Sequence, residues 1–120
     1  VLLDGRVLGN PKDREDALCM LRDMSGRTHE VFTGVCITTT EWQRSFVAQT
    51  EVRFAALSEE EITYYVDKFR PMDKAGANGI QGKCAIYIEG IEGDYNNVVG
   101  LPVARIYKEL QKLGIDPYLW

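Results

Sequence analysis

The sequence predicts a single α/β domain in which helices pack on a twisted, mixed sheet. Residues 30–40 and 42–54 are rich in β-branched and aromatic side chains, as strands are, and lie close enough to form a long antiparallel hairpin. Residues 13–24 and 59–69 instead place apolar side chains three and four positions apart, as amphipathic helices do. These patterns alternate along 120 residues without a repeat or a low-complexity linker, so one core is expected.

The first residues predict a short hairpin. Asp4-Gly5 is a typical tight-turn pair, and it separates the apolar residues 1–3 from residues 6–8. The first of these strands is short and no initiator methionine precedes it, so we expect more of the protein to precede Val1.

The helix over residues 13–24 carries signals at both ends. Asp13, Glu15 and Asp16 crowd its first turn, where the helix dipole favours negative charge. Gly26 is the expected stop, because glycine readily adopts the left-handed conformation that ends many helices.

The remaining elements are predicted from similar signals. Ser58 and Glu61 are spaced as a capping box at the start of the second helix. Residues 84–89 form an apolar run that indicates a strand, and residues 93–100 contain turn formers that indicate a loop. Residues 102–113 predict a last helix, because proline suits a first helical position.

The loop over residues 73–82 is the segment most suggestive of ligand binding. Its three glycines let backbone approach a ligand closely, since they have no Cβ. Asp73 and Lys74 add an acid and a cation, and the amides of Asn78 and Gln81 offer the donor and acceptor that suit a nucleobase edge. The spacing matches neither a P-loop nor a Rossmann fingerprint. Taken alone, the loop is better interpreted as a surface loop whose glycines serve turns.

A second candidate site precedes the first helix. Asn10 and Lys12 lead into a helix N-terminus, where free backbone N–H groups and the helix dipole can hold an anion. From the local pattern alone, an ordinary capped helix start with a solvated lysine is the better interpretation.

The composition excludes several classes of protein. The net charge of −4 gives no electrostatic footprint for duplex nucleic acid or an anionic membrane. No apolar stretch reaches the roughly 20 residues that span a bilayer. Cys19, Cys36 and Cys84 are too far apart in sequence for a metal-ligand pair and are interpreted as buried, reduced thiols. Because His29 is the only histidine, a histidine-based metal site or triad is disfavoured.

Taken together, these segments resemble the Maf family of nucleoside triphosphate pyrophosphatases. The matching stretches follow one another at residues 2–9, 11–13, 21–29, 32–35, 50–54, 73–76, 79–82 and 93–102. Each stretch is common alone, but the ordered set spans nearly the whole chain and is specific. Asp-Lys-Ala-Gly at residues 73–76 and Gly-Ile-Gln-Gly at residues 79–82 resemble the branch that acts on dTTP and UTP.

The resemblance implies the mixed α/β fold shared with inosine triphosphate pyrophosphatases, with the substrate in a cleft. It implies a cytoplasmic hydrolase that splits a nucleoside triphosphate into the monophosphate and pyrophosphate, assisted by Mg²⁺ or Mn²⁺. The implied partner is therefore a nucleoside triphosphate, with neither nucleic acid nor membrane, and a homodimer is left open.

The resemblance carries substrate binding onto Gln81, Lys74, Asp73, Lys12 and Asn10. Gln81 would help to select the base. Residues 1–120 would be the C-terminal two thirds of one Maf-like domain, and no catalytic residue or metal ligand is assigned within them. The family's Ser-x-Ser-Pro-Arg-Arg phosphate-binding segment is missing, and its Ala-Asp-Thr motif, with the general base, would lie a few residues before Val1. The chain alone is therefore expected to be inactive and less stable than its parent.

Two departures leave a second interpretation open. Asn10 stands where the family usually has lysine, and Asn78 stands where it usually has an aromatic residue, commonly tyrosine. The alternative is a catalytically inactive Maf-like module that keeps the fold for binding or dimerisation. An Asp-Thr pair and an Arg-Arg pair in the sequence upstream of Val1 would favour the enzyme.

Overall fold

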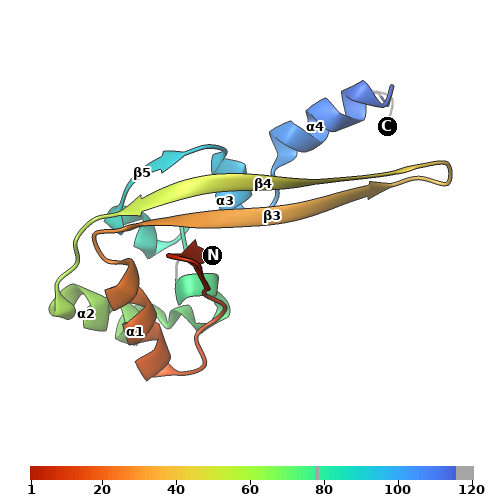
Figure 1. The fold of residues 1–120 in the computed structure, drawn as a ribbon. Helices are drawn as coiled ribbons and strands as arrows, with labels where there is room; N and C mark the ends of the chain where they lie inside the picture. The colour runs from red at the N-terminus through yellow and green to blue at the C-terminus, as the bar shows by residue number, and fades with distance from the viewer. Residues whose placement is uncertain (78, 116–120) are drawn as a thin grey trace.

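The computed structural model describes residues 1–77 and 79–115, except for the side chain of Ala75. A five-stranded sheet runs through it, with two helices packed at one end and a long hairpin projecting from the other (Figure 1). The radius of gyration is 16.8 Å, compared with about 14 Å for a compact domain of this length. The projecting hairpin accounts for the difference.

The strands are β1 (Leu2–Leu3), β2 (Arg6–Val7), β3 (Thr28–Thr38), β4 (Gln43–Phe54) and β5 (Ile88–Glu92), in the spatial order β2-β1-β3-β4-β5. Both predicted hairpins are present. One turns at Asp4-Gly5, and the other pairs β3 with β4 over their whole length. The predicted α/β class is confirmed. The expected mixed sheet is not seen among the described residues, because all of their strand pairs are antiparallel.

The strand predicted at residues 84–89 is wrong in its position. Lys83–Tyr87 forms a 3-10 helix, and β5 begins only at Ile88, which pairs with Phe54. A short apolar run does not by itself distinguish a strand from a turn of helix. Here the segment meets the core mainly at Cys84, which is fully buried, and not at alternate residues as a strand would.

The helices are α1 (Arg14–Met24), α2 (Glu59–Phe69), α3 (Tyr95–Val99) and α4 (Val103–Lys112). Asp13 caps α1 by accepting from the N–H of Asp16 at 2.8 Å. The capping box predicted for α2 is present, because Ser58 and Glu61 each bond the other's backbone N–H. α3 lies where a loop was expected, since Asp94 caps a single short helix there.

The hydrophobic core lies between α1, α2 and the end of the sheet. Leu21 and Met24 of α1, Ile62 of α2 and Phe54 of β4 are each at most 1% exposed. Removal of this apolar surface from water, at about 25 cal/mol per Å², is the main stabilising contribution at this end of the molecule.

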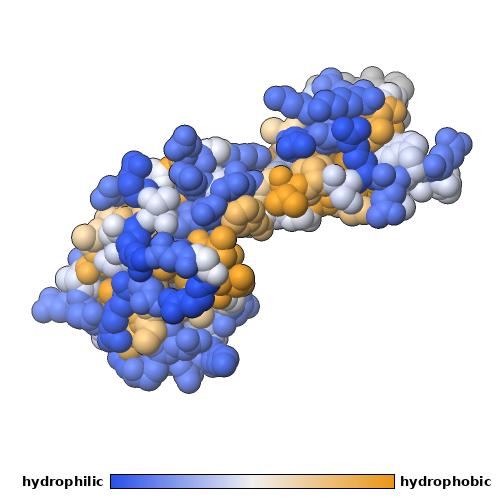
Figure 2. All heavy atoms as spheres, viewed as in Figure 1, coloured by the Kyte–Doolittle hydropathy of each residue, from blue (hydrophilic) through white to orange (hydrophobic). Residues whose placement is uncertain are grey.

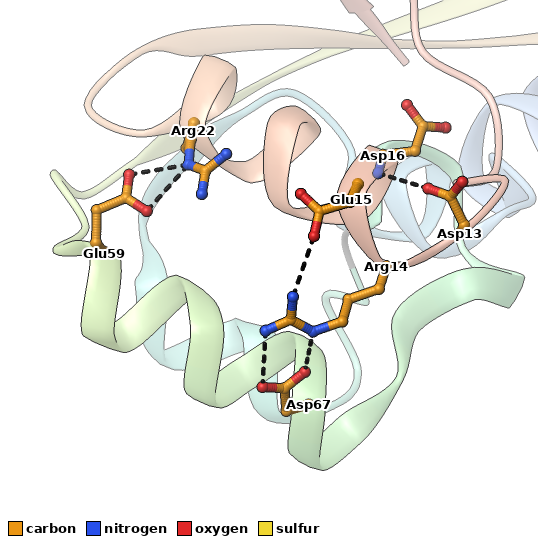
Figure 3. Close-up of polar contacts among 7 residues, drawn as sticks. All are labelled: Asp13, Arg14, Glu15, Asp16, Arg22, Glu59 and Asp67. Carbon is orange, nitrogen blue, oxygen red and sulfur yellow. Dashed lines mark hydrogen bonds and ion pairs between the residues drawn. The ribbon is translucent and has the colours of Figure 1, made fainter.

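Two ion pairs join α1 to α2 at the surface of this core (Figure 3). Arg14 donates to both carboxylate oxygens of Asp67, at 2.6 and 3.1 Å, and Arg22 donates to Glu59 at 3.0 Å. The hydrogen bond from Arg14 is the main reason that the pKa of Asp67 is lowered. Because all four side chains are largely exposed, these ion pairs contribute less to stability than the hydrophobic core beneath them.

The distal half of the β3–β4 hairpin forms an arm, and α4 lies along it (Figure 1). Glu109 of α4 is 1% exposed and pairs with Arg44 of the arm at 2.7 Å and with Arg105 at 2.9 Å. Arg105 also lies over the ring of Phe46, 4.7 Å from its centroid. Figure 2 shows apolar atoms gathered where the arm leaves the body of the molecule. Charge pairing and a cation–π contact therefore hold α4 to the arm.

The burial expected for the cysteines is wrong at two of the three positions. Cys84 is buried, but Cys19 and Cys36 are exposed. Cys19 lies off the buried face of α1, and Cys36 lies on the solvent-facing side of the arm. Among the helices of residues 1–77 and 79–115, none combines the length and the apolar character needed to cross a membrane.

Candidate functional site

A cavity of about 660 Å³ opens beside β3. It is lined by Val1, by residues 31–33 of β3, by residues 73–74 and 79–82 of the glycine-rich loop, and by residues 97–100 in and after α3. Its volume lies within the range of about 300–1,000 Å³ that is common for small-molecule sites. Because these segments are far apart in sequence, the cavity exists only in the folded chain.

The glycine-rich loop reaches the cavity through two short 3-10 turns, Pro71–Asp73 and Ala75–Ala77. Gly76 adopts a left-handed conformation with a φ of 68°, and its N–H donates to the carbonyl of Gly9 at 2.9 Å. This bond fastens the loop to the segment that precedes α1.

Lys74 is the only cationic side chain among the described residues that line the cavity. Its aliphatic stem lies against the backbone of Gly79, where a Cβ would stand 2.5 Å from the Lys74 Cδ atom. Its ammonium lies 3.3 Å from the carboxylate of Asp73. Since Asp73 is largely exposed, this pair is weak and a phosphate oxygen can replace the carboxylate as the partner of the ammonium.

Two buried groups support the same loop from the core. The Tyr65 hydroxyl and the Cys84 thiol interact with each other and with the backbone of Gly79. Burial raises the pKa of the Cys84 thiol to about 11 and also raises the pKa of Tyr65. Both groups are protonated at neutral pH, so Cys84 is not a nucleophile and serves packing and loop support.

α3 supplies a wall of the cavity that sequence reasoning missed. Asp94 starts the helix by accepting from the N–H of Asn96 at 2.8 Å. The side chain of Asn97 is fully buried, and its amide donates to the Val31 carbonyl at 3.3 Å and to the Thr50 hydroxyl at 3.1 Å. The local signal was an aspartate cap before an apolar pair, but nothing local shows that the helix is docked on the sheet.

Three of the five predicted binding residues meet at this cavity. Gln81, Lys74 and Asp73 all line it, whereas Asn10 and Lys12 are exposed and do not. Asn78 lies outside the described residues. That any of these side chains binds a substrate stays a prediction.

Carboxylates of the chain bond backbone N–H groups around Lys12 and the start of α1. The N–H of Lys12 donates to the carboxylate of Asp16 at 2.9 Å. The N–H of Asp16 in turn donates to the carboxylate of Asp13 at 2.8 Å. Carboxylates of the chain therefore already take up N–H groups that would otherwise face an anion.

Among the described residues, no group of three or more His, Cys, Asp and Glu side chains is placed to hold a metal ion. Asp73 is the carboxylate that lines the cavity. Mg²⁺ is commonly bound by one or two carboxylates together with the phosphates of the substrate. Asp73 suits that mode of binding as one oxygen ligand, and the metal would compete with Lys74 for it.

Comparison with known sequences assigns the chain to a family. A family model described as "Maf-like protein" matches residues 1–113. The chain therefore belongs to the Maf family, which confirms the resemblance found in the sequence.

Three similar curated proteins share one name. The chain is 58% identical over 114 residues to a dTTP/UTP pyrophosphatase of Bacteroides thetaiotaomicron, covering 94% of the chain and 59% of that relative. It is 52% identical over 121 residues to a dTTP/UTP pyrophosphatase of Agathobacter rectalis, covering 97% of the chain and 59% of that relative. A dTTP/UTP pyrophosphatase of Carboxydothermus hydrogenoformans is 53% identical over 116 residues, covering 95% of the chain and 62% of that relative. The chain thus spans about three fifths of the length of these relatives.

Proposed function

We propose that the protein containing this chain is a nucleoside triphosphate pyrophosphatase that hydrolyses dTTP and UTP to the monophosphate and pyrophosphate. One observation carries the proposal. Gln81, Lys74 and Asp73 line a single cavity of nucleotide size, in a chain 58% identical to a relative named dTTP/UTP pyrophosphatase. An amide, a cation and a carboxylate in one cleft match the base, the phosphates and the metal of such a substrate.

Gln81 is the residue proposed to recognise the base. Its amide can donate to a ring carbonyl and accept from the ring N–H, a pairing that thymine and uracil both offer. The flanking residues Gly79 and Gly82 also line the cavity, so backbone can approach the base on either side of this side chain.

Lys74 and Asp73 are proposed to form the phosphate end of the site, where the phosphates and their metal ion would bind. Lys74 supplies a point charge for a phosphate oxygen, and its stem is held in place by the backbone of Gly79. Asp73 would hold Mg²⁺ or Mn²⁺ together with the phosphates. When bound, that metal polarises a phosphoryl oxygen and helps to activate water.

The general base is expected outside residues 1–120, by the resemblance to the family. That motif would lie a few residues before Val1, and Val1 lines the cavity, so a base there would stand next to the proposed phosphate end. The 120-residue chain alone is therefore expected to lack activity, since a general base typically contributes about 10²–10⁴-fold. Cytoplasmic location and the possibility of a homodimer stay predictions from the resemblance.

The test uses the full-length gene product with dTTP, UTP, CTP and GTP, each with Mg²⁺ or Mn²⁺, and measures pyrophosphate release. Hydrolysis of dTTP and UTP in preference to the others is expected. Binding without hydrolysis would instead favour the inactive module, which the Asn10 and Asn78 departures leave open.

Gln81→Ala is the variant that tests the reading of the base. It should lower kcat/KM for dTTP and UTP by about 1–3 kcal/mol, because a buried polar edge loses its partner. Gln81→Glu, which keeps the length but cannot donate, should lose a similar amount. Gln111→Ala is the matched control, since Gln111 is exposed on α4 and bonds only Tyr107 among the described contacts. Unchanged base preference in both Gln81 variants would contradict this role.

A further inference from the structure

A single buried side chain joins two parts of the cavity lining. Asn97 of α3 is 0% exposed, and its amide nitrogen donates to the Val31 carbonyl at 3.3 Å and to the Thr50 hydroxyl at 3.1 Å. Val31 and Thr50 are direct cross-strand partners in the β3–β4 ladder. One amide group therefore bonds both strands at a single pair of opposed residues.

The two elements that Asn97 joins both face the ligand space. Residues 31–33 of β3 and residues 97–100 of the α3 segment line the cavity. A shift of α3 along or away from the ladder would therefore change the shape of the cavity directly. α3 is only five residues long, and a helix that short has little stability of its own.

The Thr50 hydroxyl strengthens the same attachment. While it accepts from Asn97, it donates to the carbonyl of Asp94 at 3.2 Å, at the start of α3. Gly93 allows this close approach, because a Cβ there would lie 3.0 Å from the Thr50 hydroxyl oxygen and 3.2 Å from its Cα. Gly93 also has a φ of 124°, a conformation that other residues rarely adopt.

The asparagine at position 97 contributes two hydrogen bonds but also carries a cost in stability. The amide oxygen of Asn97 is buried and has no hydrogen-bond partner among the described residues. A buried acceptor without a partner is destabilising, and this cost offsets part of what the two donated hydrogen bonds contribute to stability. The gain from the asparagine is geometric, since its two N–H groups fix α3 at one place on the ladder.

We propose that Asn97, acting through Thr50 and the Val31 carbonyl, is a positioning residue that fixes α3 as a wall of the cavity and thereby sets the affinity for the nucleotide. This inference rests on the proposed function for its nucleotide, but the docking of α3 can be tested without it.

The variants separate the hydrogen bonds from simple packing. Asn97→Ala removes both donors, and Thr50→Val keeps the shape of threonine but loses the hydroxyl. Thr50→Ser retains the hydroxyl and serves as the rescue. Asn96→Ala is the matched control, because Asn96 is the exposed neighbour on the same helix and does not line the cavity.

The first measurement is steady-state hydrolysis of UTP by the full-length gene product. Asn97→Ala and Thr50→Val should each raise KM by about tenfold with kcat within about twofold, the pattern of lost binding rather than lost chemistry. The double variant should be no worse than either single one, because both act through one attachment. Thr50→Ser and Asn96→Ala should stay near wild type. A lower melting temperature with unchanged KM would reduce Asn97 to a structural residue and overturn the inference.

The second measurement is backbone hydrogen exchange of the same variants without nucleotide. Peptides covering residues 95–100 should exchange faster in Asn97→Ala and Thr50→Val, while peptides of α2 should keep their protection. Unchanged exchange in these peptides would overturn the inference, whatever the kinetics. If the wild type hydrolyses no nucleoside triphosphate, the proposed function fails, and the exchange rates alone decide whether Asn97 holds α3.

Discussion

Gly79→Ala is expected to disable the cavity by moving Lys74 while the fold stays intact. A Cβ at position 79 would lie 2.5 Å from the Lys74 Cδ atom and 2.6 Å from its Cε atom. Carbon atoms in contact prefer separations of about 3.5–4.0 Å, so the lysine stem has to retreat by about 1 Å or more. The stem is flexible, so the cost in stability should be about that of a strained rotamer, 0.5–1.5 kcal/mol.

The consequence for activity should be much larger than the consequence for stability. A misplacement of about 1 Å in a group that positions substrate can cost about 10²-fold in rate. We therefore expect kcat/KM for UTP to fall by about that factor in the full-length gene product, with a nearly unchanged melting temperature. Gly34→Ala is the matched control, because a Cβ at Gly34 would meet no atom within 4 Å and Gly34, on β3, does not line the cavity.

A double-mutant cycle tests whether the effect passes through the lysine. Lys74→Ala removes the obstructed side chain, so Gly79→Ala should have almost no further effect in that background. If Gly79→Ala lowers kcat/KM by the same factor with and without Lys74, the close contact between the two residues is irrelevant and the reasoning fails.

The remaining predictions concern titratable groups. Burial raises the pKa of Cys84 to about 11, whereas hydrogen bonding by Thr38 is the main cause that lowers the pKa of the exposed Cys36. Iodoacetamide at neutral pH should therefore label Cys36 well before Cys84 in peptide mass spectra, and equal rates would contradict this account. Burial is the main cause that lowers the pKa of His29 from 6.5 to about 4. The unfolded chain binds this proton first as the pH falls, so stability should be lost progressively from about pH 6.5 to about pH 4, by about 3 kcal/mol in total. Urea unfolding of His29→Gln should show a flatter dependence in that window, and a slope equal to that of the wild type would speak against it.

Local signals in the sequence predicted the starts of α1 and α2 well. The Asp13 cap and the capping box of Ser58 and Glu61 each involve residues at most three positions apart, so the sequence shows all the partners at once. The long hairpin was equally accessible, because its two strands are adjacent in the chain and their composition is typical of strands.

The cavity could be predicted only in part, for a physical reason. The glycine-rich loop, with Gln81 and Lys74, was visible because one short segment carries its chemistry. The α3 wall was not, since the bonds from Asn97 reach partners 66 and 47 residues away. Nothing in the turn-forming pattern of residues 93–100 shows which residues of the sheet they will contact.

Residues 8–13 show two local interpretations that compete for the same backbone groups. A lysine before a helix N-terminus suggested a place for an anion, but helix capping and anion binding use the same free N–H groups. The carboxylates of Asp13 and Asp16 stand nearby in sequence and take up those groups in the fold. The acidic first turn therefore supports the capped helix start that the local pattern favoured, and binding by Asn10 or Lys12 stays a prediction.

The charge of the chain also bears on why the placement of Lys74 matters. With a net charge of −4 and screening over about 8 Å at physiological salt, the surface of these 120 residues does not as a whole draw a triphosphate toward the cavity. Capture then depends on groups that the ligand touches, and Lys74 is the only cationic side chain among the described lining residues. Among these lining residues, no second cationic side chain can take the place of Lys74 when it moves. The bare backbone of Gly79, with the Tyr65 hydroxyl and the Cys84 thiol behind it, gives the lysine stem a firm surface to lie on.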